Sequence, residues 1–443
     1  MALGKIRLLK KHLTRNASSL FIPGSKATDS YSFLSPILDF DERFTDCDKL
    51  SYQLRCRKMP VDIHAIRDSW EFYKSIDQQR QLIESQREEL TSKIKKLKKD
   101  PNNSIEDLKT QGAILRHDLR VVKEVLWQLE ETVIIRALNL PNDLDDKTPL
   151  EPVVLRSHGR KPTGTSSCHT EIGSKRHLVE YINPLHYYLA DDAALLELAA
   201  TKWVSTCFSD FIRVSGSDFA RDFVIEASGR DHTDPQASFI LTDHSDHEAK
   251  LGKLHLVGGS SLAAFLSMHT KQLINPKSLP LRYYAVGRQY TPTVGKTDPG
   301  LFNVCQSTTV DCFTLTKSMD SEFNEEFSRL VDVITGVYDN LDRHYRVVLR
   351  AAHELKPWEC LRISFELWSR HSQKYIEVGN LSTHGNYFSK RLLIAFQTST
   401  GRSYPAVITG TVISVPRLLG CLIEDRDDFV PEIIKQHISD LCN

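Results

Sequence analysis

The sequence predicts an α+β protein in which a two-helix coiled-coil arm near the N-terminus precedes a larger domain of strands and helices. Three stretches support this prediction: heptad-patterned segments within 62–138, a helix-then-strand pattern from Tyr187, and a strand followed by an amphipathic helix over 409–425. With 443 residues, of which 40% are hydrophobic, the chain can bury a large core and is expected to hold two domains. No run of 18 apolar residues is present, so we expect neither a membrane span nor a membrane partner.

The arm is predicted over residues 40–140, from two helical segments at 62–99 and 104–138 that are separated by a turn at 100–103. The turn reads Asp-Pro-Asn-Asn, in which Pro disfavours helix for the residue before it and Asn suits a turn. A connection this short leaves only antiparallel neighbours. The second segment has apolar residues spaced three, four or seven apart, as a coiled coil requires, at Leu108, Leu115, Leu119, Val122, Leu126, Leu129 and Val133.

The chain after the arm is predicted to be a linker over 141–176, because several Pro, Gly and Ser residues fall in it. The larger domain is then expected over 177–443. Within it, residues 187–208 have the composition of a helix, and the segment that follows alternates at first like a strand.

The first 28 residues differ in composition from the rest and are predicted to be a mitochondrial transit peptide. No Asp or Glu occurs before Asp29, and Ser18 and Ser19 add the serine that is typical of such leaders. A disordered basic tail is the alternative. Without these residues the formal net charge falls from 0 to −6, so any contact with nucleic acid must come from local patches. The six basic residues of the segment are Lys5, Arg7, Lys10, Lys11, Arg15 and Lys26.

No metal site is predicted. The nine Cys residues are scattered without a CxxC spacing, which indicates reduced thiols and neither a disulfide framework nor a zinc site. An Asp-His-Ser-Asp-His run at 243–247 has no third or fourth ligand at a suitable spacing, so we interpret it as a solvated loop.

The most informative stretch is Thr409–Asp425. Its β-branched residues, among them Ile413 and Val415, predict a buried strand, and Pro416 suits the first position of a helix. Arg417 would then lie at a helix N-terminus, a place that favours anions. An arginine in an ordinary core hairpin is the alternative.

This stretch resembles motif 3 of class II aminoacyl-tRNA synthetases, specifically seryl-tRNA synthetases, in which the motif's Arg contacts the phosphates of ATP. Residues 187–208 and 211–229 resemble motif 1, through which class II synthetases dimerise, with Gly216 where the family has Pro. The resemblance implies an antiparallel β-sheet flanked by helices over 177–443. It also implies that the arm corresponds to the hairpin that holds the long variable arm of the tRNA.

By the same resemblance, residues that would bind serine and ATP have been replaced. Ser261 stands where the family has the Glu that pairs with the substrate amine, and a hydroxyl cannot offer the charged acceptor that an ammonium needs. In motif 2, Thr291 replaces the Arg that holds the α-phosphate, and Asn303 replaces a second Arg. The family positions lost are Gly259, Ser261, Thr291, Thr293, Asn303 and Thr383.

Three charged residues remain at positions that the resemblance assigns to the nucleotide site, and we treat them as vestigial: Asp311, Glu377 and Arg417. One preorganised donor to a developing charge is typically worth about 10²–10³ in rate. Losing both Arg residues and the amine-binding Glu should therefore abolish adenylation. We expect no enzyme activity, no catalytic residue, and no binding of ATP or Mg²⁺.

The sequence thus predicts a non-catalytic seryl-tRNA synthetase paralogue in the mitochondrial matrix that supports mitochondrial translation. The expected partners are the active mitochondrial seryl-tRNA synthetase in a mixed dimer, or a second copy in a homodimer, and RNA such as tRNA. Two other interpretations stay open: an interaction scaffold that never meets nucleic acid, and an active serine–tRNA ligase with a rebuilt site. RNA contact is assigned to a lysine cluster at the arm tip. The alternative is that these lysines only complement the negative end of the helix dipole at the helix C-terminus. The cluster consists of Lys93, Lys95, Lys96, Lys98 and Lys99.

Overall fold

The computed structural model describes residues 18–24, 34–97, 106–241, 252–292, 300–317 and 321–442. The chain divides into two compact units. The smaller unit holds 38–55, 59–140 and the N-terminal segment up to Phe33, and the larger unit holds 34–37, 56–58 and 141–443. Several predicted features lie outside the described residues, namely 1–17 and 25–28 of the leader, the 243–247 run, Thr293, Lys98 and Lys99.

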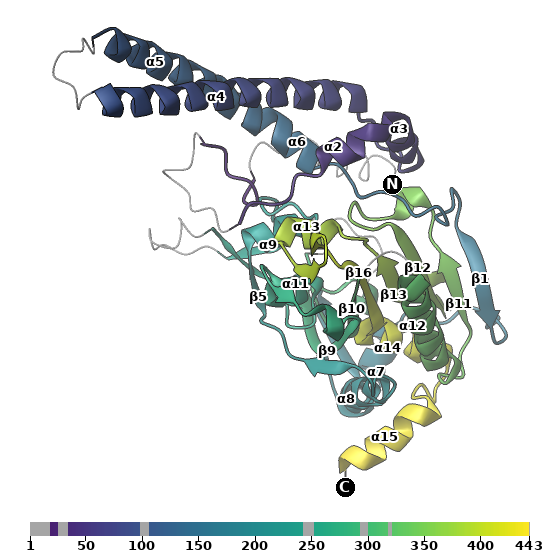
Figure 1. The fold of residues 1–443 in the computed structure, drawn as a ribbon. Coiled ribbons are helices and arrows are strands. Elements are labelled where there is room, and N and C mark those ends of the chain that lie inside the picture. Colours follow the sequence, from purple (N-terminus) through teal and green to yellow (C-terminus); the bar gives the residue numbers. More distant parts are fainter. Residues whose placement is uncertain are drawn as a thin grey trace. The chain divides into compact units, whose positions relative to one another are not determined.

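The smaller unit contains the predicted two-helix arm (Figure 1). Helices α4 (Ile63–Leu97) and α5 (Glu106–Leu129) lie side by side in opposite directions. The predicted seam of α5 is buried or half-buried along its length, and Leu119 and Leu126 are fully covered. On α4, Leu90 is buried as well. The heptad pattern is therefore confirmed as the packing face of the hairpin.

The second arm helix changes its geometry near its end. Glu130–Ile134 (η3) form a π-helical turn, and α6 (Ile135–Leu138) completes the helix. The sequence predicted one regular helix to residue 138. A single π turn leaves the apolar residues on the buried side, so their spacing did not reveal it. Short helices precede the arm: α2 (Phe40–Arg43), η2 (Phe44–Asp46) and α3 (Cys47–Cys56).

An eight-stranded sheet forms the centre of the larger unit, in the order β1-β11-β12-β13-β16-β10-β9-β4. Neighbouring strands are antiparallel except for β4 and β9, which are parallel. The antiparallel sheet implied by the resemblance is therefore confirmed. In sheet order the strands are β1 (Val153–His158), β11 (Tyr345–Leu349), β12 (Leu361–Ser369), β13 (Lys374–Thr383), β16 (Ala406–Ser414), β10 (Gln306–Thr316), β9 (Leu281–Tyr290) and β4 (Ile212–Val214).

Helices flank this sheet (Figure 1). The apolar sides of α8 (Asp191–Thr206), α12 (Ser321–Asp339) and α14 (Val415–Asp425) join one buried cluster with the inward-facing residues of the central strands. In the described part of the chain, no helix has both the length and the apolar character that crossing a bilayer requires. The remaining elements are α7 (His169–Lys175), β2 (Val179–Asn183), β3 (His186–Leu189), β5 (Phe219–Arg221), α9 (Asp222–Ala227), β6 (Phe239–Leu241), β7 (Leu254–Leu256), α11 (Leu262–His269), β8 (Leu273–Ile274), η4 (Pro276–Ser278), η5 (Gly300–Asn303), η6 (Ala352–Glu354), α13 (Tyr387–Leu392), β14 (Ala395–Thr398), β15 (Gly401–Ser403) and α15 (Glu432–Cys442).

Residues 141–176, for which we expected a linker, belong to the larger unit. They supply β1, which pairs with β11, and α7. Between these elements, the Lys161 ammonium lies 3.4 Å from the centre of the Trp368 ring, a cation–π contact. The Pro and Gly residues of this stretch therefore shape bends between segments that are themselves paired or packed.

The helix expected from Tyr187 begins later than the sequence indicated. Tyr187 lies in β3, which pairs with β2 as an antiparallel hairpin, and α8 starts at Asp191. Pairing with β2 overrides the helical composition of these residues, because propensity is a weak prior against tertiary contacts. After α8, β4 supplies the expected strand.

Candidate functional site

Arg417 occupies the first turn of α14, just after Pro416, as the sequence predicted. Its Nε donates a hydrogen bond to the Phe302 main-chain oxygen (3.2 Å), and one terminal nitrogen donates to the Glu377 main-chain oxygen (2.9 Å). The guanidinium therefore connects α14 to η5 and β13. Two of its donor groups are directed at carbonyls of the chain, whereas a phosphate-binding arginine directs them at its ligand.

The Glu377 side chain is also paired within the chain. Arg362 forms a short ion pair with it, the Ser364 hydroxyl donates to it at 2.5 Å, and Arg350 lies 3.8 Å away. Burial alone would raise the pKa of Glu377, but Arg362, Ser364 and the neighbouring arginines hold that pKa at about 2. The carboxylate is therefore ionised and its charge is compensated.

Glu377 is one member of a larger network of charges on and next to β11, β12 and β13. Arg362 also pairs with Glu359 (2.9 Å), and Arg350 also pairs with Glu366. Glu366 in turn accepts from the Arg346 Nε (2.6 Å). Carboxylates and guanidiniums alternate in this network, so it needs no metal ion or nucleotide to balance its charge.

Asp311 lies in a different environment, in the middle of β10. It is buried, and its carboxylate accepts hydrogen bonds from Gln289 (2.8 Å), Thr411 (2.6 Å) and Thr309. All three donors are neutral. Burial raises the pKa of Asp311 to about 7, and the three hydrogen bonds offset only part of that rise.

Further hydroxyl groups surround Asp311. The Ser260 and Thr309 hydroxyls lie 3.0 Å apart, and the Ser260 hydroxyl donates to the Arg288 main-chain oxygen (3.2 Å). Ser307 and Ser414 form a second hydroxyl pair at 3.0 Å. This region of the sheet can offer neutral hydrogen bonds, but these groups provide no positive charge for a phosphate.

The positions that the resemblance marks as replaced have differing surroundings where the structure describes them. The Ser261 side chain caps α11 by accepting from the Ala264 N–H (3.2 Å). Thr291 donates its main-chain N–H to the Cys305 oxygen (2.8 Å), and Asn303 ends η5. Thr383 is buried at the end of β13, and within the described chain its hydroxyl has no hydrogen-bond partner. The structure therefore gives Ser261 a role in starting a helix.

Gly259 is held by the segment that follows β4. Its N–H donates to the Asp218 carboxylate (2.8 Å), and its main-chain oxygen accepts from the Gly216 N–H (3.2 Å). A Cβ on Gly216 would lie 2.6 Å from the Gly259 oxygen and 2.9 Å from the Ala264 Cβ. The Pro that the family has at this position would lose the N–H and would clash, so this close approach accounts for the departure from motif 1.

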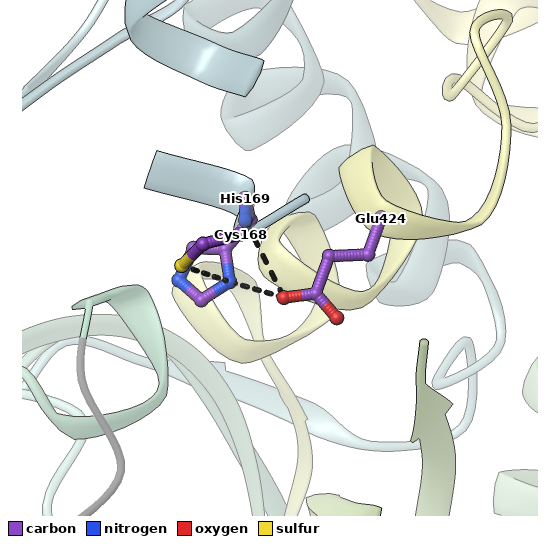
Figure 2. Close-up of side chains that lie close together, drawn as sticks. All are labelled: Cys168, His169 and Glu424. Atoms are coloured by element: carbon purple, nitrogen blue, oxygen red, sulfur yellow. Dashed lines mark hydrogen bonds and ion pairs between the residues drawn. The ribbon is translucent and has the colours of Figure 1, made fainter. Parts of the chain in front are cut away.

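Sequence reasoning missed a buried cluster of Cys168, His169 and Glu424 (Figure 2). The His169 Nδ1 lies 2.6 Å from a Glu424 oxygen and 4.0 Å from the Cys168 sulfur. The His169 Nε2 accepts the Leu301 main-chain N–H (2.9 Å). The other Glu424 oxygen accepts from the Ser369 hydroxyl.

These contacts determine what the cluster can do. Because Nε2 accepts an N–H, Nδ1 must carry the ring proton and donate it to Glu424. No ring lone pair remains for a metal ion, and no ring nitrogen is available as a base toward the Cys168 thiol. We therefore interpret the cluster as a connection between the start of α7, η5 and the end of α14. His169 and Glu424 are 255 positions apart in the sequence, which explains why no short-range spacing revealed the cluster.

Part of the lysine cluster assigned to RNA contact lies in the described chain. Lys93, Lys95 and Lys96 are exposed in the last turns of α4, which ends at Leu97. The structure therefore leaves these three ammonium groups accessible to a ligand.

Residues 249–426 match the family described as the tRNA synthetase class II core domain (G, H, P, S and T). The chain contains a class II tRNA synthetase core domain. The predicted resemblance is thus confirmed, and the motif 2 and motif 3 segments described above lie within the matched residues. The seryl-tRNA synthetase from Pyrococcus horikoshii, solved in complex with ATP, shares the fold with a TM-score of 0.78 at 18% identity, over 91% of this chain and 98% of that one.

Two relatives match this chain along most of its length. The serine–tRNA synthetase-like protein Slimp of Drosophila melanogaster is 29% identical over 426 residues, covering 94% of this chain and 90% of that protein. The mitochondrial serine–tRNA ligase of Mus musculus is 27% identical, covering 90% of this chain and 81% of that protein. The similarity to seryl-tRNA synthetases therefore extends beyond the core domain to the arm.

Proposed function

We propose that this protein is a non-catalytic seryl-tRNA synthetase paralogue of the mitochondrial matrix, where it acts as an RNA-binding subunit and dimer partner of the active enzyme and supports mitochondrial translation. One observation supports the proposed loss of catalysis: the charged groups left at nucleotide-site positions make hydrogen bonds or ion pairs within the chain. Arg417 donates to two main-chain carbonyls, Glu377 pairs with Arg362, and Asp311 is surrounded by neutral donors.

Adenylation needs positively charged protein groups that contact the phosphates of ATP. It also needs a negatively charged group that contacts the substrate ammonium. The motif 2 positions now carry Thr291 and Asn303, and the amine position carries Ser261, which caps α11. Neutral groups do not replace charge-assisted hydrogen bonds, which are about twice as strong. We therefore propose that neither ATP nor Mg²⁺ is bound for catalysis.

ATP–pyrophosphate exchange with serine, and then with each other amino acid, tests the loss of activity. The mitochondrial serine–tRNA ligase of mouse serves as the positive control. We expect no exchange above the buffer rate for this protein. Robust exchange with any amino acid would establish a rebuilt active site and refute the proposal.

Exposed apolar residues in and just before the segment that resembles motif 1 support dimerisation. They come from the β2–β3 hairpin, α8 and β4, and each is between 51% and 60% exposed. Exposed large apolar residues are candidates for an interaction site. These residues are Ile182, Leu185, Tyr188, Leu198 and Ile212.

Co-expression with the mitochondrial seryl-tRNA synthetase, followed by size-exclusion chromatography and mass measurement, tests the partnership. We expect a mixed dimer that is lost in the Leu198→Glu/Ile212→Glu variant. Val154→Glu is the matched control, because Val154 is 52% exposed on β1, at the opposite edge of the sheet. Two separate species for the unaltered proteins would remove the mixed dimer from the proposal.

The arm supports RNA contact through Lys93, Lys95 and Lys96, which are exposed near the end of α4. Contacts of this kind are made to phosphates, so binding should weaken steeply with salt and should discriminate poorly between sequences. Residues 61–140 hold 14 basic and 14 acidic side chains, so the tip differs from the rest of the arm by its local excess of lysine.

Filter binding to mitochondrial tRNA at several salt concentrations tests this contact. Changing all five tip lysines to Ala should weaken binding and reduce the salt slope by roughly 0.7–0.9 for each lysine that contacts a phosphate. A control that removes five exposed lysines of the larger unit should leave the slope unchanged. Unchanged affinity and slope in the tip variant would exclude the arm tip as the RNA contact. No binding by the unaltered protein would favour a scaffold that does not bind RNA. The control lysines are Lys175, Lys202, Lys253, Lys271 and Lys277.

A further inference from the structure

Part of the segment that the sequence assigned to the leader is folded into the smaller unit. Residues 18–24 are described, and they belong to the same unit as the arm. Leu20 is only 1% exposed and Pro23 is buried. The Phe21 N–H donates to the Ser18 hydroxyl (2.9 Å), which fixes a turn.

The end of this segment is attached to the second arm helix. The Gly24 N–H donates to a Glu130 carboxylate oxygen (2.8 Å) on the π-helical turn. A Cβ on Gly24 would lie 2.1 Å from the Trp127 Nε1, so only glycine fits against this indole. Burial raises the pKa of Glu130, and the hydrogen bond from Gly24 works against that rise.

These contacts would all be lost if the first 28 residues were removed. The surface that covers Leu20 would be exposed, and Glu130 would lose the N–H that it accepts. Trp127 would lose the segment that lies against its ring. A leader that is cleaved off cannot be a part of the structure that the remaining protein needs.

We propose that the leader ends before Ser18, and that residues 18–24 stay on the protein as a strap across the arm. The proposal rests on the matrix location proposed above. A processing peptidase would hydrolyse one peptide bond N-terminal to Ser18, consuming one water and leaving a carboxylate on the leader and an amine on the protein. Lys5, Arg7, Lys10, Lys11 and Arg15 all precede Ser18, so the shorter leader keeps five of the six basic residues.

The strap is tested with recombinant chains that begin at residue 18 or at residue 29. The chain from Ser18 should melt at the temperature of the full-length protein. The chain from Asp29 should melt several degrees lower, with tryptophan emission shifted to the red. In the full chain, Gly24→Ala should also lower the melting temperature, whereas Gly336→Ala should not, because an added Cβ there meets no described atom within 4 Å. Equal melting of the two truncated chains would overturn the strap.

The processing position is tested by identifying the N-terminal peptide of the protein isolated from mitochondria. We expect a first residue between 2 and 18 that is generated by cleavage. A first residue beyond Ser18, or an uncleaved chain, would overturn the proposed leader boundary. If the protein is absent from mitochondria, the matrix location fails instead, and the melting comparison still decides whether the strap exists.

Discussion

Replacing Asp311 by Asn should make the protein more stable at pH 8. Burial raises the pKa of this carboxyl from 3.8 to about 7 in the folded protein. Between these two values the folded chain holds a proton that the unfolded chain has released. Stability is therefore greatest below the lower value and is lost as the pH rises toward the upper one. With 1.36 kcal/mol for each pKa unit, the loss is on the order of 4 kcal/mol by pH 8.

Asparagine suits this site because it is neutral at every pH and nearly the same size. With its oxygen at the place of the Asp311 Oδ2, asparagine still accepts from Gln289 and Thr309. The Thr411 hydroxyl, which now donates to Oδ1, can rotate and accept from the amide N–H. The variant should therefore keep the packing of β10 and remove the ionisation. Other titrating groups cancel in the comparison, since both proteins contain them.

Urea unfolding followed by tryptophan fluorescence at pH 5, 6, 7 and 8 measures the difference in free energy of unfolding. The advantage of Asp311→Asn should grow from about 1.6 kcal/mol at pH 5 to about 4 kcal/mol at pH 8. Asp332→Asn changes an exposed carboxyl on α12 and serves as the control. A difference that does not vary with pH would refute the assignment of the buried proton.

Three further substitutions test packing and charge, each by the urea midpoint. Gly216→Ala should cost about 1–3 kcal/mol through the clash with the Gly259 loop, and an unchanged midpoint would contradict the close approach. Glu377→Gln should cost about 3 kcal/mol or more, because Arg362 keeps only one carboxylate partner; a stabilised variant would show that the pair is not buried in effect. Leu126→Ala should cost about 2–5 kcal/mol and lower the helical signal of the arm, and a cost below 1 kcal/mol would count against a tightly packed seam.

Features that depend on short-range sequence patterns were predictable from the sequence. The heptad spacing of Leu119 and Leu126 determines which side of α5 faces α4, because the α-helix repeats at short range. The start of α14 was predictable for a similar reason, since Pro416 fits only the first turn. The family resemblance itself was also predictable, because family motifs are contiguous in the chain.

Contacts between distant segments were not predictable. Arg417 carried a motif that implies anion binding, but its acceptors lie on η5 and β13, which no sequence pattern links to it. The basic composition of the first 28 residues concealed that Leu20 is a core residue. Tyr187 was assigned to a helix because the composition around it favours a helix. Its strand conformation depends on pairing with β2, which the local sequence does not show.

The double attachment of α14 to η5 affects how related sequences should be classified. Arg417 donates to the Phe302 oxygen, and Glu424 connects through His169 to the Leu301 N–H, so both ends of the helix are fixed to the same short turn. An arginine with such a bracing role would be retained after its substrate has been lost. Its presence is therefore a poor marker of a working ligase, whereas a positive charge at positions 291 and 303 would be an informative one.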